Sequence, residues 1–171
     1  MAAKTIITEP NKILRQISQK VISVGKAEQD LMNDMLDSMY AANGIGLAAI
    51  QIGVPKRIIV IDISKDENKK EPRYFVNPII ESRDSIKSTY EEGCLSVPNQ
   101  FAEIDRPKKC DIEYLDYYGE KKFLSAEGLL ATCIQHEMDH LEGILFIDYL
   151  SKLKKSMIIK KLSKKDRKSV V

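Results

Sequence analysis

Residues 126–142 read AEGLLATCIQHEMDHLE and contain both histidines of the 171-residue chain. Ser125 precedes this stretch at a position suited to capping a helix, and Gly143 follows it, as is typical of a helix end. We therefore predict a helix over residues 126–142. An α-helix turns about 100° per residue, so His136 and His140 lie roughly 40° apart on one face and can bind a single metal ion.

Glu137 follows the first of these histidines and projects about 60° beyond His140, which places it beside such an ion. A carboxylate in that place can take a proton from metal-bound water and pass it to a leaving group. The alternative is a surface helix whose histidine spacing arose by chance. The sequence contains no other histidine, which favours the metal site.

A catalytic metal needs a third protein ligand. After His140 the sequence has no histidine or cysteine, and its acids are Glu142, Asp148 and Asp166. The first two are too near in sequence, and the third lies in a basic segment. Cys94, in the run EGCLSVP of residues 92–98, is the better ligand. Two imidazoles and one thiolate leave one position of a tetrahedral ion open for water, as in a catalytic zinc site.

The other cysteines offer a structural alternative. Cys133 lies three residues before His136 on the same helix face and could complete a closed Cys2His2 site. Glu137 would then have no role, so we expect Cys133 to line the wall of a pocket, together with Leu129 one turn earlier. Cys110 lies in an alternating run and is expected to pack in the core.

A glycine-rich segment, GIGLAAIQ, occupies residues 44–51. It resembles a phosphate-binding glycine loop only superficially, because that pattern needs a strand before it and a helix after it. One interpretation is a segment of low bulk beside a substrate backbone, ending in the amide donor Gln51. The other is a helix end followed by a tight turn.

The remaining pattern predicts an α+β fold of mostly antiparallel sheets packed around a central metal-binding helix, with a basic C-terminal helix. Strand-like runs occupy residues 57–62, 74–80, 110–114 and 121–124. Helical periodicity predicts a first helix over residues 27–42, stopped by Gly44, and a last one over about 149–163. The last helix would pack through a stripe formed by Leu150, Leu153, Met157, Ile158 and Leu162.

Composition favours one domain over residues 1–171, with a catalytic body over 1–150 and a basic helix and tail over 151–171. No long uncharged apolar run and no signal peptide is present, so we expect a cytoplasmic protein. Three cysteines argue against a disulfide framework. Residues 152–171 carry nine basic residues and one acid, which suits an anionic partner such as RNA or a membrane surface, or else a solvated helix face.

Together, the three motifs resemble those of peptide deformylases, which have the forms GxGLAAxQ, EGCLS and HExxH in this order. Here they occupy residues 44–51, 92–96 and 136–140, and every motif position matches. The resemblance implies hydrolysis of the N-formyl group from the N-terminal methionine of nascent proteins, with release of formate. Because such an enzyme acts on emerging chains and ribosomal RNA is anionic, we expect the basic C-terminal helix to make the ribosome a partner, and we expect no membrane or DNA partner.

The resemblance implies roles for individual residues. Cys94, His136 and His140 would bind one divalent ion, physiologically Fe2+, with Zn2+, Ni2+ or Co2+ possible in purified protein. Metal-bound hydroxide would attack the formyl carbon with Glu137 as general base and then acid. The remaining implied roles are oxyanion stabilisation by the Gln51 amide and the Leu95 N–H, with the backbone of Gly46 close to the site. We also expect contact with the substrate by Ile45, Gly46, Leu129 and Cys133, the last two because they lie one or two turns before His136.

One segment departs from many bacterial relatives, which have an arginine shortly after EGCLS. Here residues 98–101 read PNQF, so Phe101 could pack against the peptide and substrate affinity is expected to differ. Two rival functions are a zinc endopeptidase and a metal-stapled RNA-binding protein. The first would cleave unformylated peptides internally, and the second would release neither formate nor peptide fragments.

Overall fold

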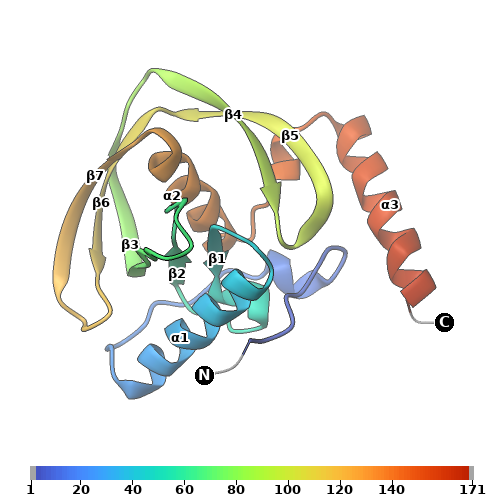
Figure 1. The fold of residues 1–171 in the computed structure, drawn as a ribbon. Coiled ribbons are helices and arrows are strands. Elements are labelled where there is room, and N and C mark those ends of the chain that lie inside the picture. The colour runs from blue at the N-terminus through green and yellow to red at the C-terminus, as the bar shows by residue number, and fades with distance from the viewer. Residues whose placement is uncertain (1–2, 170–171) are drawn as a thin grey trace.

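The computed structural model describes residues 3–169 and confirms the predicted α+β class (Figure 1). The helices are α1 (Lys26–Ala41), α2 (Gly128–Leu141) and α3 (Lys152–Ser169). Three short 3-10 turns complete the helical part: η1 (Lys12–Arg15), η2 (Ala49–Ile52) and η3 (Phe146–Tyr149). None of the helices in this described part is long and apolar enough to cross a membrane.

The strands form two antiparallel sheets. The first has the order β1-β2-β3-β6-β7 and the second is the hairpin β4-β5. Their bounds are β1 (Gly46–Ala48), β2 (Ile58–Ile61), β3 (Arg73–Arg83), β4 (Lys87–Cys94), β5 (Val97–Pro107), β6 (Lys109–Leu115) and β7 (Lys121–Glu127). The α2 helix contacts strands of both sheets and occupies the centre of the molecule, as predicted (Figure 1).

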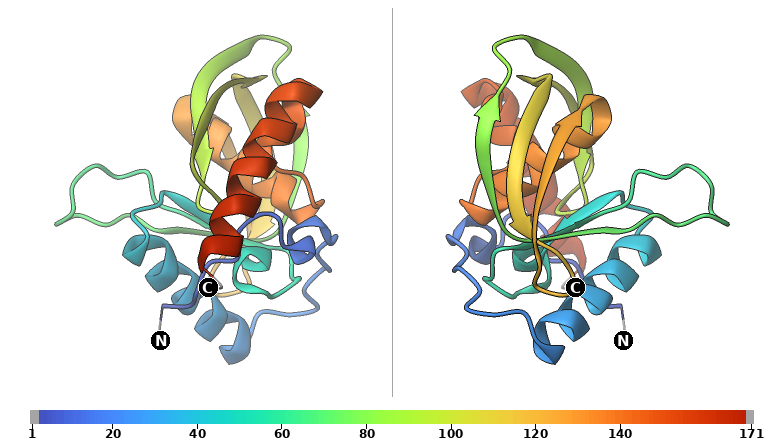
Figure 2. Two further views of the ribbon diagram at one scale, coloured as in Figure 1. Left: turned by 90° about the vertical axis from the view of Figure 1, so that its right-hand side faces the viewer. Right: turned by 90° about the vertical axis from the view of Figure 1, so that its left-hand side faces the viewer.

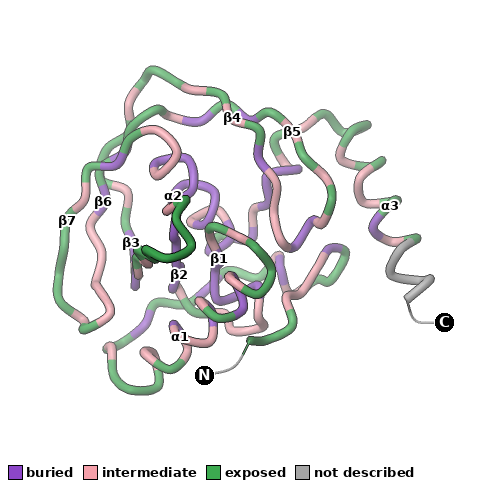
Figure 3. Tube along the Cα trace, viewed as in Figure 1, coloured by how far each residue is buried: buried purple, intermediate pink, exposed green. Residues whose placement is uncertain are grey.

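Strand β2 explains how the core is divided. Its sequence is IIVI and all four side chains are buried, because both faces of the strand are covered. Successive side chains of a strand point to opposite faces. Ile58 and Val60 pack with the methionines of α1, whereas Ile59 and Ile61 pack with Ile134 of α2. Figure 3 shows this buried centre, with exposed segments concentrated along the outer strands and α3.

The predicted start of the central helix was wrong. Strand β7 continues to Glu127, and Ser125 pairs with Asp111 in the sheet instead of capping a helix. The turn into the helix occurs at Gly128, whose φ of +63° favours glycine. The first helix likewise ends through Asn43, with φ +58°, and not through Gly44.

The hairpin β4-β5 was missed entirely. Its outward positions are mostly polar or charged, although Phe101 is among them, and its inward side chains include Ser88 and Glu92. The residues therefore lack the alternation of apolar and polar types that signals a half-buried strand. Neither the hairpin nor its pairing register could be read from the sequence.

The packing of the last helix was only partly correct. In α3, Leu162 is 5% exposed and packs into a third core cluster with Leu14 and Phe146. Leu153 and Met157, predicted in the same stripe, are 72% and 51% exposed. The helix lies along the outside of the molecule beside β5 (Figures 1 and 2), so only a narrow face is covered.

Candidate active site

Three potential metal ligands meet between α2 and the end of β4. His136 and His140 lie on the buried face of α2, and Cys94 is the last residue of β4. The Cys94 Sγ atom lies 3.3 Å from Nε2 of His140. One ligand atom from each of the three residues lies within 4.8 Å of the others, a separation that one ion can bridge.

The charges around this group suit a cation. Burial and the neighbouring His136 lower the pKa of His140 well below its usual value, so its imidazole is neutral, as metal binding requires. Burial also acts to lower the pKa of His136, but Glu137, Cys94 and Glu92 outweigh it and raise that pKa. The anionic surroundings that favour a protonated His136 would equally favour a divalent ion.

Glu92 orients the first histidine and was missed in the sequence. Its Oε1 lies 2.9 Å from Nδ1 of His136, which leaves Nε2 of that ring for the metal. Arg106 holds Glu92 by two bonds, Nε to Oε2 at 2.7 Å and Nη2 to Oε1 at 3.0 Å, and also donates to Asp139 at 2.9 Å. Burial acts to raise the pKa of Glu92, but His136 and Arg106 outweigh it and lower that pKa.

Glu137 lies beside the ligand group, as the helix geometry predicts. Its carboxylate oxygens are 4.0 Å from Nε2 of His136 and 3.9 Å from Nε2 of His140. Oε1 has no hydrogen-bond partner among residues 3–169, and burial raises the pKa of Glu137 to about 7. A Cβ atom on Gly46 would lie 2.6 Å from Oε2, so only glycine leaves room for this carboxylate.

The segment of residues 44–51 forms strand β1 and turn η2, which excludes a phosphate-binding loop. Gln51 is buried, and its amide is held at both ends. Its Oε1 accepts from the backbone N–H of Ala48 at 2.9 Å, and its Nε2 donates to Oγ of Ser96 at 3.0 Å. The same Nε2 lies 3.6 Å from Sγ of Cys94, so the donor faces the ligand group.

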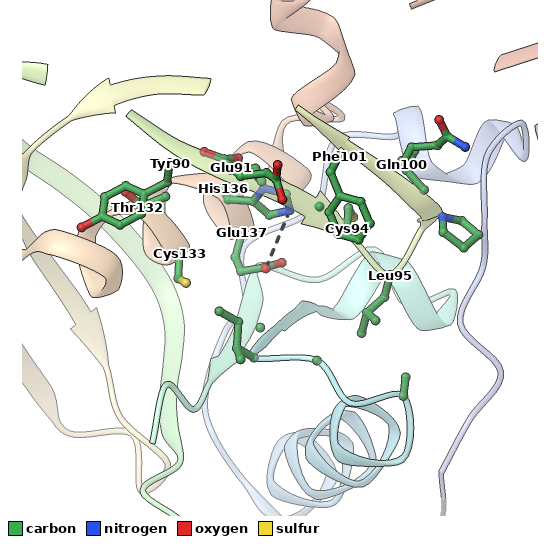
Figure 4. A pocket seen from close by; sticks show the side chains of 18 of the residues that line it. Tyr90, Glu91, Cys94, Leu95, Gln100, Phe101, Thr132, Cys133, His136 and Glu137 are labelled. Carbon is green, nitrogen blue, oxygen red and sulfur yellow. Dashed lines mark hydrogen bonds and ion pairs between the residues drawn. The ribbon is translucent and has the colours of Figure 1, made fainter. Parts of the chain in front are cut away.

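A cleft of about 510 Å3 opens onto this group (Figure 4). All the residues predicted to contact substrate line it: Ile45, Gly46, Leu129 and Cys133. Leu95 and Gln51 line it as well. Tyr90 and Thr132 belong to the same wall and were not identified from the sequence, because β4 was missed and Thr132 has no motif of its own.

The two remaining cysteines are not metal ligands in this arrangement. Cys133 lies outside the potential ligand group found among the described residues. Burial raises the pKa of its thiol to about 12, so the thiol is protonated when no metal is bound to it. Cys110 is buried in the core, as predicted.

Comparisons with known proteins point to one family. The profile of a family described as polypeptide deformylase matches residues 3–156. A peptide deformylase of Pelagibacter ubique is 76% identical over 96% of this chain and 95% of its own length. The crystal structure of the Ehrlichia chaffeensis peptide deformylase in complex with actinonin has a TM-score of 0.92 at 42% identity, covering 98% of this chain and 99% of that one. That of the Legionella pneumophila peptide deformylase has a TM-score of 0.91 at 44% identity, covering 99% and 98%.

Proposed function

The chain belongs to the polypeptide deformylase family, and from this premise we propose how its cleft removes the N-formyl group from the N-terminal methionine of nascent proteins. The protein is a hydrolase. The observation that carries the proposal is that the ligand atoms of Cys94, His136 and His140 lie within 4.8 Å of one another. A cleft reaches two of these residues, Cys94 and His136, and the buried carboxylate of Glu137 beside them.

The family implies a metal ion, and the three residues fit one. Two imidazole nitrogens and a thiolate form a donor set that suits Fe2+, Zn2+, Ni2+ or Co2+, and we assign Fe2+ as the physiological ion. A bound divalent ion lowers the pKa of a water molecule and polarises the formyl oxygen. Arg106 and Glu92 support the site by fixing the ring of His136.

Glu137 moves the proton. Its free Oε1 and a pKa near neutrality suit a general base that accepts a proton from the attacking water. The protonated carboxyl then donates to the departing amine, so formate and a free N-terminus are released. Glycine at position 46 keeps this carboxylate clear of the neighbouring strand.

Two donors stabilise the negative charge that develops on the formyl oxygen. The Gln51 amide is held by Ala48 and Ser96, so its N–H group is oriented before the substrate arrives. We assign the second donor to the backbone N–H of Leu95, in the turn that follows Cys94. Donors of this kind contribute about 10²–10³ to the rate.

The two ends of the cleft differ, and this difference determines the orientation in which the peptide substrate binds. Figure 4 shows Tyr90, Thr132 and Cys133 on one side of Glu137 and Phe101, Gln100 and Leu95 on the other. Thr132 and Cys133 are buried, whereas Phe101 is 64% exposed. The first side chain therefore enters the closed end between β4 and α2, and the rest of the peptide leaves past Phe101.

The test is formate release from a formyl-methionyl peptide by anaerobically purified protein, because ferrous iron beside a thiolate is sensitive to oxidation. Deformylation predicts formate and an intact peptide. Internal cleavage of an unformylated peptide would instead identify an endopeptidase. If neither product were detected, a binding protein would remain as the explanation.

We also propose that the chain has two functional parts. Residues 1–150 form the catalytic body, and residues 151–171 form a basic element that attracts the ribosome. Its lysines Lys154, Lys160, Lys161 and Lys164 are exposed, and ribosomal RNA is an anionic surface. Because nascent chains are the substrate, we place the enzyme in the cytoplasm. Residues 170 and 171 lie outside the described part of the chain.

A further inference from the structure

A second cavity, of about 530 Å3, lies against a different face of α2 from the metal ligands. The helix contributes Gln135, Met138, Asp139 and Glu142 to its wall, and their spacing of three or four residues places them in one stripe. None of these four residues lines the catalytic cleft. The volume is within the range of ligand-binding cavities, and the proposed mechanism makes no use of this one.

Part of the lining is apolar. Residues 78–80 of β3, Met138 of α2 and Pro107 of β5 belong to it. Ile79 is 55% exposed and Tyr149, which also lines the cavity, is 54% exposed. Apolar surface in contact with water favours a ligand whose hydrocarbon body covers it.

The lining also contains cations without partners. Arg83 is the last residue of β3 and Lys87 the first of β4, and both line the cavity. Neither side chain forms an ion pair or a hydrogen bond within the described part of the chain. The backbone N–H of Lys108 donates to the carbonyl of Ile86 at 2.8 Å, which brings a third exposed basic residue to the same turn.

The acids of the lining, in contrast, have partners. Asp139 accepts from Arg106 at 2.9 Å, and Glu142 accepts from Arg57 at 2.7 Å. Asp105 is exposed and accepts from the hydroxyl of Thr89 on the neighbouring strand. Positive charge without a partner is therefore concentrated where β3 turns into β4, and it can attract an anion.

We propose that this cavity is a second ligand site, for a small molecule that has an apolar body and one anionic group, either a carboxylate or a phosphate. The body would cover Ile79 and Met138, and the anion would bind Arg83 and Lys87. Ile79 and Arg83 are four residues apart on β3, about 13 Å along a strand, a separation that their side chains and a medium-chain carboxylate can bridge. The site is independent of the proposed deformylase reaction.

The experiment titrates the full-length, zinc-loaded protein with octanoate and with octyl phosphate. Octanol lacks the charge and inorganic phosphate lacks the body, so they serve as incomplete probes. Binding is followed by the NMR signals of isotope-labelled methionine methyl groups, because Met138 lines the cavity whereas Met32, Met35 and Met39 are buried against α1 and β2. The Met138→Leu variant assigns the signal.

We expect both octyl anions to shift the Met138 signal saturably, and the incomplete probes to bind about tenfold more weakly or less. The double variant Arg83→Gln with Lys87→Gln should weaken octanoate binding about five- to tenfold and leave octanol binding the same. Arg73→Gln with Lys20→Gln is the matched control, because it removes the same charge from exposed positions outside the cavity. Its affinity for octanoate should equal that of the wild type.

A Met138 signal that neither anion shifts would overturn the inference. Equal octanoate affinities for the wild type and the Arg83→Gln, Lys87→Gln variant would overturn it as well. If octanoate inhibited formate release from formyl-Met-Ala-Ser without shifting the Met138 signal, the anion would bind in the catalytic cleft and the second site would be refuted. Because binding is read from Met138, a protein that released no formate would still test the site.

Discussion

At the scale of single residues, Glu137 and the three ligands have separable roles. Glu137→Ala removes the proton carrier but leaves Cys94, His136 and His140 in place. We expect this variant to retain its metal while kcat falls by about 10²–10⁴. Cys94→Ala is the matched comparison, because two remaining ligands should not hold the ion. Metal analysis and turnover of both variants check this, and near-normal kcat for Glu137→Ala would refute the acid/base assignment.

Gln51 tests the oxyanion assignment. Gln51→Ala removes an amide that faces Cys94 but contributes no metal ligand. The interaction belongs to the transition state, so we expect kcat to fall by about 10²–10³ while metal content and fold stay the same. Steady-state kinetics measure kcat and KM for the variant and the wild type. A raised KM with unchanged kcat would make Gln51 a residue that positions the substrate.

At the scale of elements, Glu92 and Arg106 join the hairpin to α2. In Glu92→Gln the side chain still reaches Nδ1 of His136 but loses its charge, so the ring is held less firmly. We expect the metal dissociation constant to rise about 10- to 100-fold. Competition with a chelator measures it, after circular dichroism has shown that the variant is folded. Glu91→Gln, at the adjacent and exposed position, should leave the constant unchanged. Equal metal dissociation constants for Glu92→Gln and Glu91→Gln would contradict the role of Glu92.

Asp148 connects η1, η3 and α3. It accepts from Arg15 at 2.6 Å, from Lys155 at 2.7 Å and from the backbone of Leu145 at 3.1 Å. Burial acts to raise the pKa of Asp148, but these bonds outweigh it and lower that pKa. A group whose pKa is lower in the folded state stabilises the fold above its unfolded pKa, and this contribution is lost as pH falls.

Asp148→Asn should therefore lower the free energy of unfolding by about 1–2 kcal/mol at pH 7. The difference from wild type should shrink below about pH 4, where the unfolded carboxyl is protonated. Urea unfolding at pH 7 and pH 3 measures this difference. Asp37→Asn, on the exposed face of α1, should change stability by less than about 0.5 kcal/mol. If Asp148→Asn lowered the free energy of unfolding by the same amount at both pH values, the charge of Asp148 would not be the source of its stabilising effect.

At the scale of the whole molecule, the basic C-terminal element is anchored to the catalytic body. Leu162 packs against Leu14 and Phe146, so truncation after Lys155 would open a core cluster and confound a binding experiment. Charge reversal avoids this problem. The variant with Lys154, Lys160, Lys161 and Lys164 changed to glutamate preserves both Leu162 and the Lys155–Asp148 ion pair.

We expect this variant to deformylate a free formyl-methionyl tripeptide within about twofold of wild type, since the lysines lie away from the cleft lining. It should co-sediment poorly with ribosomes, and wild-type binding should weaken steeply with added salt, because phosphate contacts release counterions. Replacing the same lysines with glutamine provides an intermediate charge. Ribosome binding that is equal in all three proteins would make the basic surface a solvated helix face.

The sequence by itself determined the local chemistry of α2. The helical repeat places His136 and His140 on one face and Glu137 beside them, whatever packs against the helix. It also predicted four strands of the larger sheet, three of them from runs in which apolar residues are continuous or alternate. Cys94 was predicted as the third metal ligand because no histidine or cysteine follows His140 in the sequence. These inferences depend on spacing within one element or on residue type.

Only the tertiary structure decided which distant groups meet. Cys94 and His140 are 46 positions apart in sequence, yet their ligand atoms lie 3.3 Å apart. Glu92 pairs with His136 because of the way β4-β5 packs on the rest of the molecule. Leu153 and Met157 are exposed because of the way α3 packs. The hairpin packs on η3 through Val97 and Ile104 and is joined to α2 by the ion pair between Arg106 and Asp139. Such contacts join residues far apart in the chain and leave no periodic signal in the sequence.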